Sequence, residues 1–219
     1  MIISSIELNT AHPEVRRETT DLCLTHSRII DMTVGMPTDG PRVLWARPRK
    51  NLLVVRAPDP ITEARLPSGY AKSISYREWV PPNEPGRWRM VAVINPGRQQ
   101  HRRIKVGDTI QRIPVGMKLV PVDDLPQQAS WFARRLASGR THEPLRPVDE
   151  VATINTWRVV SAATRRSRHR KGHLIVVRHL VVEADITVRD PELVAMSVMH
   201  GVGRDKTWGC GLTIWQRYE

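Results

Sequence analysis

The chain has 219 residues, 40% of them hydrophobic, and is long enough for one large domain or two small ones with buried cores. A formal net charge of +12 predicts a polyanionic partner, because cations near phosphates release condensed counterions; charge that serves solubility alone is the alternative. Cys23 and Cys210 are the two cysteines, which excludes a disulfide framework and a four-cysteine zinc site.

The first segment, residues 2–8, predicts a strand because apolar and polar residues partly alternate there. The opening MIISSIELNT lacks the charged n-region and long apolar run of a signal peptide. No stretch approaches the roughly 18 apolar residues of a membrane span. We therefore expect a soluble, cytoplasmic protein that does not bind membranes.

Residues 12–34 predict a helix in two pieces, since Pro13 suits a first turn and Asp21 can cap a second piece that begins at Leu22. Three strands are expected next, with Arg49 and Lys50 at the turn between the first two: residues 42–48, 51–58 and 69–76. With a short helix before the last strand, the order is β-α-β-β-α-β, which is that of a ferredoxin-like domain.

Residues 79–88 hold three prolines and a glycine without periodicity and predict a linker. The second half then repeats the order of elements, with its expected strands at 88–95, 153–164, 173–188 and 208–216 and its helices at 123–139 and 190–201. We predict an α+β chain of two tandem ferredoxin-like (RRM-like) βαββαβ domains, residues 1–80 and 88–219, joined by a linker at 81–87.

The run RRSRHRKGH at 165–173 carries five permanent cations between two predicted strands, so we expect a loop or a hairpin tip. Such runs are commonly solvated loops, but anchored strands on both sides would present the cations rigidly to phosphates. We predict contact with RNA or DNA through five side chains: Arg165, Arg166, Arg168, Arg170 and Lys171. His169 and His173 have an H-x3-H spacing, but the surrounding cations would repel a metal, and no metal site is expected.

The sequence holds no paired carboxylates in metal-binding spacing, no G-x-S-x-G and no Walker motif. A two-metal nuclease, which needs several carboxylates, is therefore not expected. Metal-free RNA cleavage stays open, because the 2′-hydroxyl attacks the neighbouring phosphate and the protein supplies a proton acceptor, a proton donor and cations. A histidine can exchange that proton near neutral pH. His26 on the first helix and His200 before the glycines are the candidates, and spacing alone does not decide between them.

The segment GVGRDKTWGCGL at 201–212 combines four glycines with three charged residues. Glycine tolerates positive φ and lets another backbone approach closely. Gly203, Arg204 and Lys206 are therefore predicted to meet an RNA backbone, or the segment packs on the protein's own first helix. A cradle for a nucleotide phosphate is the alternative, although these glycines follow a helix and lead into a strand, opposite to the P-loop and Rossmann order.

This segment resembles the glycine-rich signature of CRISPR repeat-processing endoribonucleases, specifically the CasE family of type I-E Cascade. The family pattern is approximately G-x-G-R-x-K-x-x-G-x-G-L, and these residues fit it: Gly201, Gly203, Arg204, Lys206, Gly209, Gly211 and Leu212. The similarity runs nearly end to end and includes SSIELNTAHPEVRRE, LPSGYAKSISY and WRMVAVINP. The basic run lies where family members carry an arginine-rich hairpin at the base of the repeat stem-loop.

The resemblance implies two ferredoxin-like domains and a metal-independent endoribonuclease without a cofactor. Such an enzyme cuts precursor crRNA at the 3′ base of the repeat stem by 2′-hydroxyl attack and stays on the crRNA 3′ hairpin as a Cascade subunit. The implied partners are therefore the repeat RNA and the backbone and guide-capping subunits, with target DNA reached only through the complex.

The family's catalytic histidine falls on His26, and Arg28 is expected to help neutralise the scissile phosphate. Cys23 stands where the family's D-P-Y-x-x-H pattern has its tyrosine. A catalytically inactive RNA-hairpin-binding subunit of the same kind of complex is therefore the alternative function.

Overall fold

The structure is a computed structural model. It describes residues 1–37, 41–106, 109–139, 144–168, 172 and 174–218, and within 98–119 the backbone alone.

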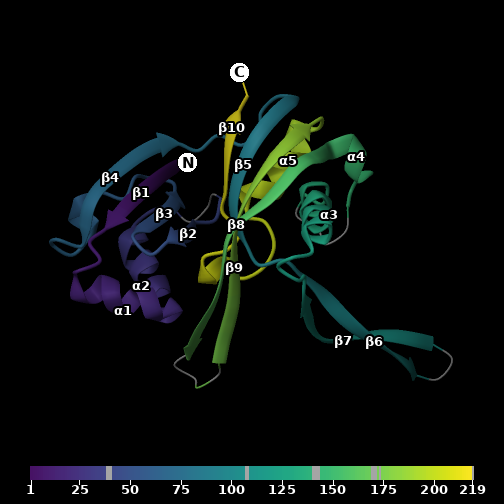
Figure 1. Cartoon of the computed structure of the whole chain (residues 1–219), viewed down its shortest axis with the longest axis horizontal. Helices are drawn as coiled ribbons and strands as arrows, with labels where there is room; N and C mark the ends of the chain where they lie inside the picture. Colours follow the sequence, from purple (N-terminus) through teal and green to yellow (C-terminus); the bar gives the residue numbers. More distant parts are fainter. Residues whose placement is uncertain (38–40, 107–108, 140–143, 169–171, 173, 219) are drawn as a thin grey trace.

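The first half of the chain forms a four-stranded antiparallel sheet with two helices on one face (Figure 1). Its elements in chain order are β1 (Ile2–Leu8), α1 (Pro13–Thr20), α2 (Leu22–Thr33), β2 (Leu44–Arg49), β3 (Leu52–Ala57), the 3-10 helix η1 (Glu63–Arg65) and β4 (Ala71–Glu78). The strand order is β2-β3-β1-β4, so the first and third strands of the unit occupy the centre of the sheet.

The second half forms another four-stranded sheet and one separate strand pair. Its elements are β5 (Gly86–Ile94), β6 (Gly97–Val106), β7 (Thr109–Leu119), α3 (Leu125–Leu136), α4 (Val148–Val151), β8 (Ala152–Arg168), β9 (Leu174–Val188), α5 (Pro191–Met199), the 3-10 helix η2 (Lys206–Trp208) and β10 (Thr213–Arg217). The order β10-β5-β9-β8 again places the unit's first and third strands in the centre. Two ferredoxin-like sheets with helices confirm the predicted α+β fold class.

The helix caps form as the sequence predicted. Asp21 breaks the first helical stretch with an extended backbone, and its Oδ1 accepts a hydrogen bond from Cys23 N at 2.7 Å to begin α2. Asp190 accepts from Leu193 N at 3.0 Å to begin α5, and Gly201 follows the end of that helix with φ of 82°. The predicted linker 81–87 lies between β4 and β5, although its last two residues already belong to β5; the division into domains at this linker stays a prediction.

Two differences from the predicted elements concern the surface of the second half. No sequence pattern indicated the β6–β7 pair, which is an insertion between β5 and α3. The predicted hairpin tip at 165–173 is partly wrong, because Arg165–Arg168 are the last residues of strand β8. Figure 1 shows both the β8–β9 hairpin and the β6–β7 pair extending from the same side of the molecule.

Both hydrophobic cores contain residues of both sheets. One core joins Ile3 and Val54 of the first sheet to Trp88 and Leu212 of the second half. The other lies under α1 and α2 and includes Val177 of β9. Because neither core closes without the other half, the two sheets are held in a defined relation, and the seam between them is a place where side chains can be positioned.

Candidate active site and nucleic-acid interface

The glycine segment 201–212 packs tightly against two tryptophan rings. Gly203 and Gly209 have φ of 82° and 84°, a left-handed conformation that favours glycine. A Cβ atom on Gly209 would lie 2.7 Å from a ring carbon of Trp45, and one on Gly203 would lie 2.8 Å from a ring carbon of Trp131. The bare backbone therefore lets the segment approach the protein's own aromatic side chains rather than form an open phosphate cradle.

The prediction that Gly209 and Gly211 lie inside a strand is wrong. Strand β10 begins at Thr213, and both glycines precede it with φ of 84° and 89°. That conformation is incompatible with an extended strand, and it allows the chain to turn from η2 into β10 beside Trp45.

The segment brings Trp208 against His26 of α2, with ring centroids 5.4 Å apart in an edge-to-face arrangement. The turn that carries Trp208 is held from the first sheet, since Trp45 Nε1 donates to Thr207 O at 3.2 Å. Arg42 Nη2 donates to Thr207 Oγ1 at 2.9 Å on the same turn. His26, Arg42 and η2 therefore form one site at the seam, which we call the His26 site.

The electrostatics of the His26 site favour a neutral imidazole beside cations. Burial and then the charge of Arg42 lower the pKa of His26 below its ordinary value. Burial and then the charges of Arg42 and Arg135 lower the pKa of Lys206. An imidazole that is unprotonated at neutral pH can accept a proton, and the nearby cations can hold an anion.

Arg42 was not among the predicted site residues, because no local pattern distinguishes it from the other 33 lysines and arginines. Its position is set by Arg56, whose side chain is fully buried and donates to Arg42 O at 3.0 Å. Arg56 also donates to Val198 O at 3.3 Å and to Met199 O, and it stacks on Trp79 at 4.2 Å. Burial lowers the pKa of Arg56 to about 10, so the side chain remains charged at neutral pH.

The cations of the β8–β9 hairpin divide between two faces. Arg165 is half-buried and donates to Thr19 O at 3.4 Å, and Ser167 accepts from Leu22 N at 2.7 Å, so both face the helices. Arg166 and Arg168 are exposed. Arg170 and Lys171, as well as His169 and His173, lie outside the described residues.

A second histidine is buried at the seam and contacts the backbone of Trp208. His179 is 3% exposed, and its Nε2 donates to Trp208 O at 2.8 Å. Burial first, and then the charge of Arg165, lower the pKa of His179 to about 4. His179 is thus neutral under ordinary conditions and holds the tryptophan that contacts His26.

Arg28 lies elsewhere on α2 and is already neutralised. Its Nε donates to Glu18 Oε1 at 2.9 Å, its Nη2 contacts Glu14, and its guanidinium stacks on Tyr70 at 5.3 Å. His200 caps the end of α5, and Cys23 directs Sγ toward Arg168 O at 3.8 Å. The predicted residues that gather at one site are therefore His26 and Lys206.

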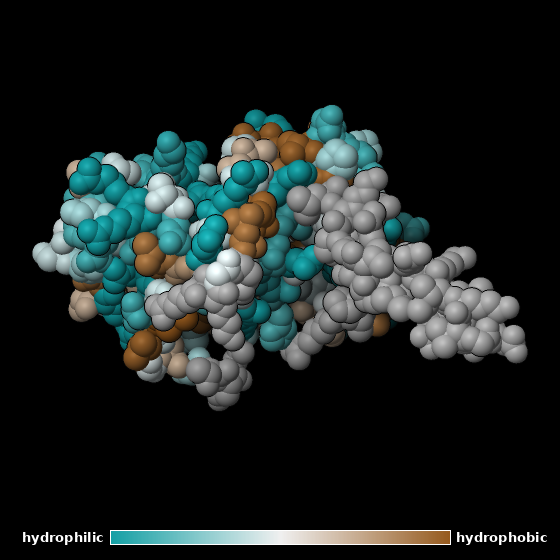
Figure 2. All heavy atoms as spheres, turned by 90° about the horizontal axis from the view of Figure 1, so that it is seen from below, coloured by the Kyte–Doolittle hydropathy of each residue, from teal (hydrophilic) through white to brown (hydrophobic). Residues whose placement is uncertain are grey.

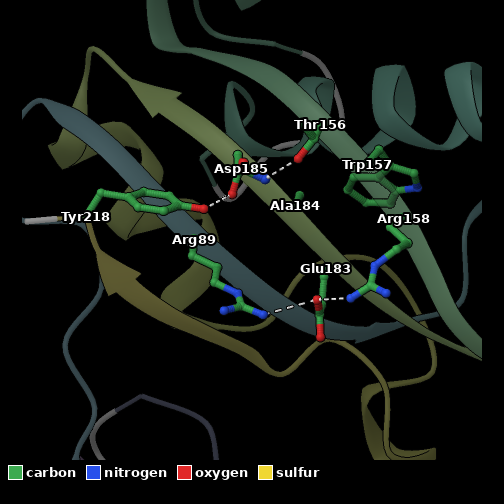
Figure 3. Close-up of a pocket in the computed structure, with 8 residues that line it drawn as sticks. All are labelled: Arg89, Thr156, Trp157, Arg158, Glu183, Ala184, Asp185 and Tyr218. Atoms are coloured by element: carbon green, nitrogen blue, oxygen red, sulfur yellow. Dashed lines mark hydrogen bonds and ion pairs between the residues drawn. The ribbon is translucent and has the colours of Figure 1, made fainter.

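The exposed face of the second sheet holds a separate pocket lined by paired charges (Figure 3). Glu183 accepts from Arg158 at 2.6 Å and from Arg89 at 3.3 Å, and Asp185 accepts from Tyr218. The hydrogen bond from Arg158 leads the interactions that lower the pKa of Glu183. This pocket offers neither an unpaired base nor an uncompensated cation, and we do not assign the chemistry to it.

Seen from the side toward which the hairpins extend, the described surface is mainly hydrophilic with scattered hydrophobic side chains (Figure 2). Within the described ranges, no three His, Cys, Asp or Glu residues are grouped so that they could hold a metal ion. None of the helices described here is both long and apolar enough to cross a membrane.

The fold and the site together define a protein of two ferredoxin-like units with a histidine and several cations at the seam between them. A family model described as "CRISPR associated protein" matches residues 1–215, and the chain belongs to that family. This confirms the family recognised from the glycine-rich segment. No curated protein is similar enough in sequence to match the chain.

Solved structures share the fold across the whole chain. The CRISPR endoribonuclease Cse3 bound to 19 nt RNA is 21% identical with a TM-score of 0.71, covering 99% of this chain and all of that one. Cse3 of Thermus thermophilus bound to an RNA representing a pre-cleavage complex is 20% identical, with a TM-score of 0.69 and 98% of each chain covered. Cas6e of Escherichia coli K-12 is 16% identical, with a TM-score of 0.62 and all of both chains covered.

Proposed function

We propose that the protein is a metal-independent endoribonuclease that binds the CRISPR repeat stem-loop and cuts precursor crRNA at the 3′ base of the stem. The observation that carries this proposal is the His26 site, where a neutral imidazole lies against Trp208 beside the charge of Arg42, and the same Arg42 charge also acts on Lys206. The family and the likeness to RNA-bound Cse3 support RNA as the substrate.

In the proposed reaction the RNA supplies its own nucleophile. His26 accepts the proton of the 2′-hydroxyl, and the oxygen attacks the adjacent phosphorus. The P–O5′ bond breaks, and the leaving oxygen takes up a proton, which yields a 2′,3′-cyclic phosphate and a 5′-hydroxyl. Arg42 and Lys206 stabilise the charge that develops on the phosphate oxygens. Arg28 receives no role in this scheme, because its charge is compensated by Glu14 and Glu18.

The outward-facing Arg166 and Arg168 of the hairpin hold the stem in this proposal, with Arg204 of the glycine segment as a further exposed cation. After cleavage the protein stays on the crRNA 3′ hairpin as a Cascade subunit beside the backbone and guide-capping proteins, and it meets target DNA only through that complex. A structural likeness to a CRISPR RNA-guided surveillance complex, at a TM-score of 0.59 and 16% identity, is compatible with this assembly.

The test compares wild type with His26→Ala on repeat RNA in the presence of EDTA. We expect wild type to cut and His26→Ala to lose about 10²–10⁴-fold in rate while it binds RNA equally well. His12→Asn is the matched control, because it removes another histidine and keeps a side chain able to cap α1.

Four results separate the parts of the proposal. Equal cutting by wild type and His26→Ala would remove His26 from the mechanism, and complete inhibition by EDTA would remove metal independence. RNA with a 2′-deoxy sugar before the scissile phosphate should bind and remain intact. Tight binding without any cutting would establish the second candidate, an inactive RNA-hairpin-binding subunit, which the thiol of Cys23 in place of a hydroxyl favours.

A further inference from the structure

Asp205 has a backbone conformation that residues with a side chain rarely adopt. Its φ of 56° and ψ of 31° are left-handed, and among the described residues it is the one that has a positive φ without being a glycine. In that region the Cβ atom lies too close to the following carbonyl oxygen. The other residues of the segment 201–212 with positive φ are glycines, which lack that atom. A strained residue persists only where its surroundings hold it in place.

The side chain that holds Asp205 is Asn95, which directly follows β5, an inner strand of the second sheet. Asn95 is 5% exposed, and its Nδ2 donates to Asp205 Oδ2 at 2.6 Å. An aspartate before a helix ordinarily caps it with its carboxylate, but in the described part of the chain the Asp205 side chain makes no cap bond to η2. The carboxylate of Asp205 serves the bond to Asn95 instead.

The Asn95–Asp205 pair is unfavourable in two respects apart from its own bond. The backbone of Asp205 is strained, and Asn95 Oδ1 is buried without a hydrogen-bond partner within the described residues. A buried acceptor without a donor is destabilising, and an apolar side chain of the same size would avoid that loss. Turning the amide over would set its oxygen against the carboxylate, so the pair has one possible orientation. Stability alone therefore does not account for Asn95, and its position beside the His26 site indicates a role there.

Asp205 sets the geometry of the turn that carries η2. Its carbonyl oxygen accepts from Trp208 N at 2.8 Å and from Cys210 N at 3.2 Å. A change of ψ at Asp205 would turn that carbonyl away and release both bonds. The left-handed conformation that Asn95 holds is thus the one that closes the turn.

The turn meets the first half of the chain at the His26 site. Trp208 lies against His26 with ring centroids 5.4 Å apart, and Thr207 accepts from Arg42 at 2.9 Å. Burial and the charge of Arg42 are the two influences that lower the pKa of His26, and both involve contacts of this turn. Since Asn95 belongs to the second half, the turn is a link through which the second sheet fixes the surroundings of the imidazole.

We propose that Asn95 is a positioning residue for RNA cleavage. Through its bond to Asp205 it fixes the start of the turn, and the turn then holds Trp208 against His26. Asn95 acts through the turn and need not contact RNA. The inference rests on the proposed function, because it takes His26 to be the group that accepts the proton.

The experiment uses a double variant that breaks the link without leaving a buried polar atom unpaired. Asn95→Leu replaces the amide by an apolar side chain of similar size, and Asp205→Gly removes both the carboxylate and the strain. Asp205→Asn is the conservative variant, because asparagine tolerates the left-handed region and keeps an oxygen that can accept from Asn95. The control combines Asn155→Ala with Thr187→Val, which removes both partners of another asparagine bond, 2.9 Å long, between β8 and β9.

Each variant is measured in three ways: by its Tm, by single-turnover cutting of repeat RNA, and by the NMR titration of the His26 imidazole in the protein without RNA. The signal of His26 is the one that disappears in His26→Ala. We expect the double variant to keep a Tm close to that of wild type and to cut about ten- to a hundredfold more slowly, because the site is misplaced. Its His26 should titrate at higher pH, since burial and the charge of Arg42 act on it less.

Asp205→Asn and the control should cut and titrate as wild type does. A double variant with the wild-type rate, or with a lower rate but an unchanged His26 titration, would overturn the inference. A loss in Asp205→Asn or in the control as large as that in the double variant would overturn it as well. Asn95→Leu alone gives the same comparison if the double variant does not fold. Wild type that binds RNA without cutting it would remove the proposed function, whereas the titration of His26 would still decide whether Asn95 positions the site.

Discussion

Arginines are numerous both at the seam and on the outer face of the second sheet, but their hydrogen-bond partners differ between the two regions. At the outer face, Arg89 and Arg158 share Glu183, and Arg87 pairs with Asp185 at 3.4 Å. At the seam, Arg42 and Arg56 donate to hydroxyl and carbonyl oxygens, and neither pairs with a carboxylate within the described residues.

This contrast separates cations that maintain the surface from cations that can hold a ligand. A compensated arginine has little net field to offer a phosphate, whereas one bonded to neutral oxygens keeps its full charge. An open pocket lies on the compensated face, whereas the chemistry we propose lies at the seam. Net charge alone therefore does not locate the nucleic-acid interface that we propose; the proposal depends on the pairing of each cation.

The largest expected difference between the two regions concerns stability. Arg56→Met leaves three carbonyl oxygens at the seam without their donor and should lower the free energy of unfolding by about 4 kcal/mol. The matched Arg89→Met removes an exposed ion pair and should cost less than about 1 kcal/mol. Urea titrations of both variants measure the difference, and equal costs would contradict the contrast.

Acid should weaken the two regions in different pH windows. His179 has an unfolded pKa of 6.5 and a folded pKa of about 4, so the unfolded state takes up the proton first and stability falls as the pH drops from 6.5 to 4. The loss amounts to about 3 kcal/mol. The lowered pKa values of Glu183 and Asp185 act at more acidic pH, because their stabilisation is lost only as those carboxylates become protonated.

Unfolding free energies measured from pH 7 to pH 3 test these windows. His179→Gln should remove most of the loss between pH 6.5 and 4 and leave the more acidic loss unchanged. If His179→Gln still loses the same stability between pH 6.5 and 4 as wild type, another group titrates in that range.

The glycine segment should tolerate a methyl group less well than an ordinary turn. Gly209→Ala combines a left-handed φ with a clash against Trp45 and should cost about 2–3 kcal/mol. Gly35→Ala has a similar φ of 77° and open space, so it should cost about 1 kcal/mol for the backbone alone. Thermal unfolding of the two variants separates the clash with Trp45 from the backbone strain. Identical shifts in Tm would show that Gly209 is not needed for packing against Trp45.

The smallest expected effect is on RNA affinity. Arg42→Gln and Lys206→Gln should each weaken stem-loop binding by about tenfold at low salt, whereas Arg89→Gln and Arg158→Gln should stay within about twofold. Arg42→Gln should also move the acid limb of the cleavage rate to higher pH, because a cation that lowers the pKa of His26 is gone. Fluorescence anisotropy and rate–pH profiles measure the two effects, and losses equal to those at Arg89 would erase the distinction.

Local signals predicted the fold well because they are short-range. Asp21 and Asp190 cap the helices they precede, and the order of strands and helices was sufficient to indicate two ferredoxin-like units. The helix predicted at 123–139 forms as α3 and buries Trp131 and Phe132. Each of these depends on residues within a few positions of one another.

The site was predictable only in part, because its pairings span long stretches of sequence. The glycine signature and His26 were recognisable, but the partner of each arginine was not. Arg165 turns toward Thr19 instead of solvent, and Arg28 toward Glu14 and Glu18 instead of His26's neighbours. The β6–β7 strand pair was not predicted, because Gly97–Leu119 is polar and interrupted by Pro114. These features are as typical of a loop as of a strand.

The edge-to-face contact of His26 with Trp208 joins two residues that are synthesised at different times. Ribosomes add about 5–20 residues per second, so Trp208 is made about 10–40 s after His26. During that interval the emerging chain has the imidazole but lacks Lys206 and the turn that carries Trp208. In the mechanism we propose, an unfinished chain on the ribosome is therefore unable to cut the RNA around it, because the His26 site is complete only when the last elements fold onto the first helices.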